Sequence, residues 1–120
     1  HAAFCEIYGR RYAGLPPEDM RAKADGGDEM YLALIRLRSL AVMGAVGDLA
    51  LANGALGGVV LAGGVSERIV DFLKTPDARE RFSVRGPMSG YLAECPVRLL
   101  RAPDAPLIGA AAWFAQVRQG

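Results

Sequence analysis

The sequence predicts an α/β fold, and two observations support that class. Stretches with apolar residues at helical spacing alternate with two short apolar runs, residues 59–62 and 97–100, in the order helix, strand, helix, strand, helix. Glycine pairs bound the first of these runs, as expected for a strand that is buried on both faces within a parallel sheet. We therefore expect helices packed on a short, mainly parallel sheet.

Size and composition favour one domain that binds neither nucleic acid nor a membrane surface. The chain has 120 residues, and its 14 Lys and Arg nearly balance 13 Asp and Glu, so no charge excess attracts a polyanion. Cys5 and Cys95 form neither a CxxC pair nor a disulfide framework. They are therefore interpreted as inert, reduced thiols of a cytoplasmic protein.

No stretch of the chain reaches the run of about 18 uncharged apolar residues that spans a bilayer, because Asp48 interrupts the longest one. The first residues also lack the basic and apolar regions of a signal peptide. The chain begins with His1, so we interpret it as a trimmed or tagged fragment and His1 as a tag remnant rather than a catalytic base.

The first half of the sequence predicts three helices. Residues 2–13 have the spacing of a short amphipathic helix, and residues 17–24 predict a few turns in a surface connector. A long helix is expected over residues 28–53, capped by Asp28 and Asn53, with its second half buried. Gly44 and Gly47 inside that helix predict the close approach of another backbone, and Asp48 is expected to have a hydrogen-bonding partner.

The second half predicts a strand, a glycine turn and several helices. The strand at residues 59–62 leads through Gly63 and Gly64 into a helix over 66–74 that Ser66 is expected to cap. An exposed helix over 76–82, a helical turn over 88–94 and a strand over 97–100 follow. The last helix covers 106–117, where Trp113 and Phe114 are expected in a core or an interface.

The glycine turn is the candidate ligand site. Gly63 and Gly64 follow a parallel strand, so a ligand could pack directly against the backbone at the carboxyl end of that strand. The alternative is a turn with a purely structural role, and the motif matches neither the P-loop nor GxGxxG. Arg79, Arg81 and Arg85 are interleaved with acidic residues and are interpreted as a solvated face.

Two runs carry a resemblance to a known family. The sequences GDLALANGALGGVVLAGGVSERIVDFL and PVRLLRAPDAPLIGAAAWF resemble the carboxy-terminal part of bacterial glucokinases, and FCEIYGRRYAGLPP is similar to an earlier helix and loop of the same lobe. The resemblance covers nearly all of residues 1–120. It implies part of the large lobe of the actin and hexokinase (ribonuclease H-like) fold, from an enzyme that transfers the γ-phosphoryl group of ATP to glucose.

The resemblance also implies which residues bind the nucleotide. The family's Gly-Gly adenosine motif corresponds to Gly63 and Gly64, with Val65 and Ser66 beginning the adjacent helix. The family's phosphate loops, its catalytic base and its glucose ligands have no counterpart in this sequence. We therefore expect no catalytic residue and no metal ligand in this chain, and ATP and Mg²⁺ only in the full-length enzyme.

Two classes of function remain open. The first is an inactive carboxy-terminal fragment of glucokinase whose partners are the remainder of that chain, ATP and glucose. The second is a non-catalytic module of the sugar-kinase type with a regulatory or self-association role, since related folds serve both purposes. Loss of a covering lobe would expose apolar surface, so a homodimer or an exchange of the first helix is also expected.

Overall fold

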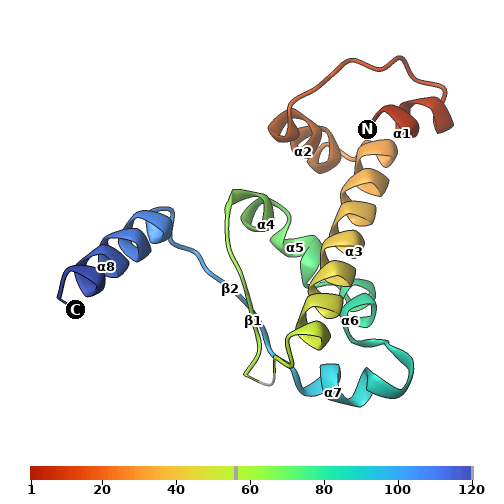
Figure 1. Ribbon diagram of the computed structural model, residues 1–120. Helices are drawn as coiled ribbons and strands as arrows, with labels where there is room; N and C mark the ends of the chain where they lie inside the picture. The colour runs from red at the N-terminus through yellow and green to blue at the C-terminus, as the bar shows by residue number, and fades with distance from the viewer. Residues whose placement is uncertain (56, 120) are drawn as a thin grey trace.

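The computed structural model describes residues 1–55 and 57–119, and it is mostly helical (Figure 1). Its elements follow in this order: α1 (Ala2–Ile7), α2 (Pro17–Asp25), α3 (Glu29–Ala52), β1 (Val59–Leu61), α4 (Gly64–Arg68), α5 (Val70–Leu73), α6 (Pro76–Ser83), the 3-10 turn η1 (Gly86–Met88), α7 (Ser89–Glu94), β2 (Val97–Leu99) and α8 (Ala105–Gln119). The predicted α/β class is confirmed.

Helix α3 is the central element, and α2, α5 and α6 pack on it (Figure 1). Its predicted caps are present at both ends. The Asp28 carboxylate accepts hydrogen bonds from the backbone N–H groups of Met30 and Tyr31, at 3.1 and 3.5 Å, and Asn53 occupies the C-cap. By length and composition α3 could also cross a membrane. Helices α2, α5 and α6 pack on α3, however, as is expected for the core helix of a folded domain.

The predicted close approach of another backbone is confirmed at Gly47 but not at Gly44, where the neighbour is a side chain. A Cβ atom on Gly47 would lie 2.5 Å from the carbonyl oxygen of Phe82, and one on Gly44 would lie 3.0 Å from Nε of Arg81. Both neighbours belong to α6. That helix buries Ala78 and Phe82 completely, so its predicted exposure is wrong for the face that meets α3.

Strands β1 and β2 form a parallel pair with Val59 opposite Val97 and Leu61 opposite Leu99, as the sequence predicts. Burial of β1 on both faces is wrong, because Val60 is 60% exposed. Successive side chains of a strand point to opposite faces, and within the described residues no element covers the face on which Val60 lies. In the described part of the chain β1 is an edge strand rather than a central one.

Several predicted helix boundaries shift for local reasons. Helix α1 ends at Ile7, since Gly9 takes a left-handed conformation with φ of 61°. The single helix expected over 66–74 is divided into α4 and α5 at Ile69, whose φ of −111° and ψ of 15° interrupt the helix. Ser66 is therefore not a cap: Gly63 holds the N-cap position of α4, and Ser66 lies inside its first turn.

Helix α8 extends away from the other helices beyond the end of β2 (Figure 1). Trp113 and Phe114 are 69% and 61% exposed, so they do not lie in the core of the described chain, and the interface expected as the alternative stays a prediction. Leu49 in the second half of α3 is also exposed, so burial of that half is only partial. The radius of gyration of 17.6 Å exceeds the roughly 14 Å of a compact chain of this length, because α8 is separate.

Candidate nucleotide-side site

A cavity of about 470 Å³ opens where both strands end. In Figure 1, β1 leads into α4 and β2 leads towards α8 at the same end of the sheet. The cavity is lined by residues from the two loops that leave the strands and from the first turns of α4 and α8: Ala62, Gly63, Gly64, Glu67, Leu100, Ala102, Pro103, Ala105 and Pro106. Ligands of parallel α/β sheets bind at this end of the strands.

The two glycines leave open space beside the backbone of the first loop. Gly63 has φ of 98° and ψ of 154°, a conformation restricted almost entirely to glycine. Gly64 has no positive φ, so its small size is not required by the backbone. A Cβ atom built on either residue would meet nothing within 4 Å. A ligand could therefore contact the backbone of this loop directly.

The structure separates the four predicted binding residues into two pairs. Gly63 and Gly64 line the cavity, and nucleotide binding by them stays a prediction. Val65 is exposed and borders a different, smaller cavity between α2, α3 and α4, and Ser66 is partly buried within α4. Neither is among the residues around the 470 Å³ cavity, where Glu67 follows Gly64 on the wall instead.

The second wall was missed by the sequence analysis. No binding role was predicted for residues 102–106, which join the strand expected over 97–100 to the helix expected over 106–117. Their position directly after a parallel strand is a signal that could have identified them, because loops at the carboxyl ends of neighbouring parallel strands meet at one edge of the sheet. Pro103 and Pro106 give this wall a rigid, apolar surface.

The charge of the cavity suits an uncharged ligand group. Among the described residues that line it, Glu67 alone is charged, and none is Lys or Arg. No cluster of three or more His, Cys, Asp or Glu side chains that could hold a metal ion occurs within residues 1–55 and 57–119. The cavity thus provides backbone and apolar contacts, without a cation for phosphate or a ligand set for a metal.

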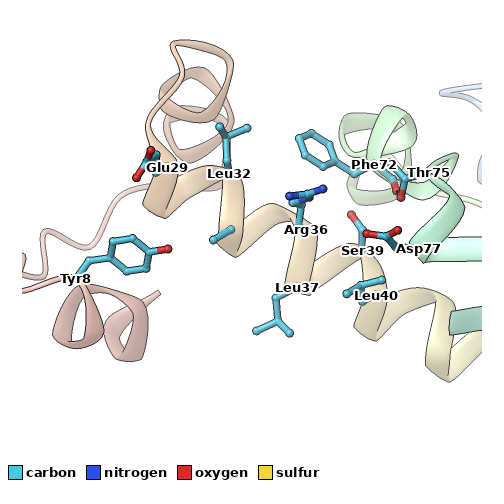
Figure 2. A pocket seen from close by; sticks show the side chains of 11 residues that line it. Tyr8, Glu29, Leu32, Arg36, Leu37, Ser39, Leu40, Phe72, Thr75 and Asp77 are labelled. Carbon is cyan, nitrogen blue, oxygen red and sulfur yellow. Dashed lines mark hydrogen bonds between the residues drawn. The ribbon is translucent and has the colours of Figure 1, made fainter.

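A second, larger groove of about 600 Å³ runs along α3, and its described lining residues include no glycine turn at the end of a strand. Figure 2 shows Tyr8 at one end, Phe72, Thr75 and Asp77 at the other, and Arg36 between them. The hydroxyl of Ser39 is not available as a nucleophile, because it donates to the carbonyl oxygen of Ile35 at 2.9 Å.

The remaining candidate residues have structural roles. Arg79 and Arg85 are exceptions to the predicted solvated face. Arg79 donates to the carbonyl oxygens of Ala93 and Cys95. Arg85, in the segment between α6 and η1, pairs with Asp48 at 2.9 Å and donates to the carbonyl oxygen of Gly44, so this segment is tied to α3. This pair confirms that Asp48 has a partner, although its side chain is 70% exposed. Cys5 and Cys95 are buried free thiols, and Cys95 donates to the carbonyl oxygen of Ala55.

The chain is an α/β unit with a short parallel sheet whose carboxyl ends open on a glycine-lined cavity, which is where α/β proteins of this kind bind ligands. Comparison with known proteins narrows the class, since the family model for glucokinase matches residues 1–117. The chain therefore belongs to the glucokinase family. The match includes His1, so the interpretation of that residue as a tag remnant is not supported.

Individual relatives agree with this assignment. The glucokinase of Caulobacter sp. (strain K31) is 41% identical over 112 residues, or 92% of this chain and 34% of its own length. That of Saccharophagus degradans is 37% identical over 98% of this chain and 37% of its own. The crystal structure of a glucokinase from an Antarctic psychrotroph matches 95% of this chain at 36% identity, with a TM-score of 0.82. The chain spans about a third of the length of these relatives.

Proposed function

We propose that this chain forms the adenosine-side wall of the ATP site in a glucokinase, an enzyme that converts glucose to glucose 6-phosphate at the expense of ATP. The observation that carries the proposal is the 470 Å³ cavity at the carboxyl ends of β1 and β2, where Gly63 and Gly64 leave the backbone uncovered. Its volume is within the range of about 300–1,000 Å³ that is usual for small-molecule sites.

The lining fits the nucleoside part of ATP and not its triphosphate. The apolar prolines and leucine of the second wall suit a base or ribose, and the Glu67 carboxylate would repel phosphate groups. ATP supplies the phosphoryl group, while Mg²⁺, the phosphates and glucose would be held by residues outside this chain, because no metal-ligand cluster is present in its described residues. The chain's own contribution is to bind and orient the nucleoside.

The other partner in this account is the remainder of a longer glucokinase chain in the cytoplasm. The chain spans only about a third of its relatives, and α8 exposes a set of large apolar side chains that a second lobe could cover. These side chains are Leu107, Ile108, Trp113, Phe114 and Val117. The chain alone would be inactive, because positioned phosphate-binding groups are needed for phosphoryl transfer.

The test uses Gly64→Val in the complete enzyme. The new side chain would enter open space rather than a packed core, so we expect little loss of folding stability but obstruction of the nucleoside. The KM for ATP should rise several-fold while the KM for glucose stays within about twofold. Gly90→Val in α7 is the matched control, because Gly90 also faces open space in a short helix but is far along the chain from the cavity loops. An unchanged ATP affinity in well-folded Gly64→Val would refute the assignment.

The exposed apolar residues of α8 favour one second candidate, a self-associating module of the sugar-kinase type without catalysis. The sequence that precedes His1 in the parent protein distinguishes the two. A phosphate loop with an Asn-Asp pair would identify a kinase, whereas a DNA-binding helix-turn-helix joined to a degenerate site would identify a regulator.

A further inference from the structure

Arg21 on α2 reaches across to the helix that carries the glycine turn. Its Nη1 donates to the backbone carbonyl oxygen of Arg68, the last residue of α4, at 2.6 Å. Its Nε donates to Asp25 on its own helix at 2.8 Å, and its Nη2 lies 3.6 Å from Asp71. The guanidinium also lies over the Phe72 ring, 5.2 Å from the centroid. One side chain thus contacts α2, α4 and α5.

Helix α4 has little else to fix its position. It contains five residues, no side chain caps its N-terminus, and Ile69 interrupts it at its other end. A single helical turn of this kind is unstable alone and depends on tertiary contacts. Its packing on α2 and α3 is incomplete, because a cavity of about 70 Å³ remains there, bordered by Met20, Val65 and Ile69 among others. The hydrogen bond from Arg21 spans the edge of this gap.

We propose that Arg21 is a positioning residue for nucleotide binding, which acts through α4 on the Gly63–Gly64 turn. The proposal rests on the proposed function of that turn. Asp25 and Phe72 hold the guanidinium plane from two sides, so its Nη1 donor has a defined direction towards the end of α4. Because α4 is short, a shift at Arg68 moves Gly64 at its other end. Loss of the Arg21 donor therefore changes the shape of the adenosine wall.

A second contact between the same elements provides a control. Arg68 and Glu18 lie 3.6 Å apart, and their side chains are 56% and 63% exposed. An exposed ion pair of this kind contributes little to the position of a helix. Glu18→Gln removes one α2 to α4 link without removing the hydrogen bond to the α4 backbone.

The experiment measures steady-state kinetics of the complete enzyme with Arg21→Met, Arg21→Lys and Glu18→Gln. Met keeps an apolar stem over Phe72 but lacks every donor. We expect Arg21→Met to raise the KM for ATP about five- to tenfold and to leave the KM for glucose within about twofold. Arg21→Lys keeps one cationic donor and should show a rise of about two- to threefold. Glu18→Gln should behave as the wild type.

A purely structural role predicts a different pattern. Lower thermal stability with an unchanged KM for ATP in Arg21→Met, or equal rises in both KM values, would overturn the proposal. If Arg21→Met is not recovered folded, Arg21→Lys is judged by the same criteria. Gly64→Val tests separately whether the Gly63–Gly64 turn binds the nucleotide. If the KM for ATP is raised in Gly64→Val but normal in Arg21→Met, only the role of Arg21 is rejected. If the KM for ATP is normal in Gly64→Val, the assignment of the nucleotide site itself is rejected.

Discussion

At the scale of single residues, three glycines show three different reasons for the absence of a side chain. Gly47 is required by packing, because the carbonyl oxygen of Phe82 occupies the place of a Cβ atom. Gly63 is required by its backbone, with φ of 98°. Gly64 is required by neither, which leaves ligand contact as the reason for its size in our account. The three can be separated by substitution.

We expect Gly47→Ala to lower the melting temperature of the complete enzyme. Its new methyl group would lie 2.5 Å from a backbone oxygen that cannot move independently of α6, and such overpacking costs about 1–3 kcal/mol. Gly90→Ala is the control, since it faces open space in α7 and should gain up to about 1 kcal/mol from helix propensity. A Gly47→Ala protein that melts at or above the wild type would contradict the packing account.

Gly63→Ala should also destabilise the protein, but through strain rather than collision. A Cβ atom would meet nothing within 4 Å, yet the backbone conformation is unfavourable for any residue with a side chain and costs about 1–3 kcal/mol. Differential scanning calorimetry of Gly63→Ala beside Gly64→Ala tests this. Equal melting temperatures for the two variants would show that the turn relaxes without cost.

At the scale of elements, α3 depends on a charged cap. Arg10 donates a hydrogen bond to the Asp28 carboxylate, and this bond lowers the pKa of Asp28, with further help from the backbone N–H groups of Tyr31 and Met30. The folded-state pKa is below the unfolded value of about 3.9, so this group stabilises the fold at neutral pH. The contribution is lost as the pH falls through the lowered pKa.

Asp28→Asn isolates this effect, because Asn keeps an oxygen that can cap the helix but loses the charge that Arg10 binds. We expect the variant to be less stable than the wild type at pH 7, and the difference to shrink as the pH is lowered towards 3. Denaturant titrations of both proteins at the two pH values provide the measurement. A difference independent of pH would show that the ion pair is not its source.

The features of this fold that could be predicted from the sequence are those with local signals. The boundaries of α3 follow from Asp28 and Asn53, and the close approach at Gly47 follows from a costly residue in a helix interior. The turn at Gly63 and Gly64 was predictable for the same reason, whereas the wall at Pro103 and Pro106 was not recognised. That wall exists only because β1 and β2 pair, a contact between residues that are distant in the sequence.

At the scale of the whole molecule, the exposed surfaces are what sequence patterns could not predict. Trp113 and Phe114 lie on an apolar helix that the analysis assigned to a core or an interface, and Val60 lies on a strand assigned to the centre of a sheet. An apolar residue indicates that burial against another surface is favourable, but it does not identify the segment that provides that surface. In the described chain no other helix or strand packs closely on α8.

Trp113 is the one tryptophan in the sequence and reports directly on this surface. We expect the 120-residue chain, expressed alone, to show the emission of an exposed indole at low concentration, since Trp113 is 69% exposed. Association into the expected homodimer through α8 should shift the emission to shorter wavelength as the concentration rises. Light scattering that shows a monomer, with unchanged emission at high concentration, would count against that association.

The isolated chain should also lack glucokinase activity, because the described residues include no metal-ligand cluster and the cavity lining has no cation for phosphate. A coupled assay with glucose, ATP and Mg²⁺ measures this, with protein purified from a host that lacks its own glucokinase. Turnover that depends on both glucose and ATP would show that the chain holds catalytic groups that the present account assigns elsewhere.

The location of the nucleoside is the central claim, and photoaffinity labelling of the complete enzyme tests it most directly. After irradiation with 8-azido-ATP, mass spectrometry of the digested protein should find the adduct in residues 62–67 or 100–106, the two loops that line the cavity. Excess ATP should suppress this labelling, and glucose alone should not. Specific labelling, suppressed by ATP, that maps entirely outside these two loops would contradict the assignment of the cavity as the adenosine site.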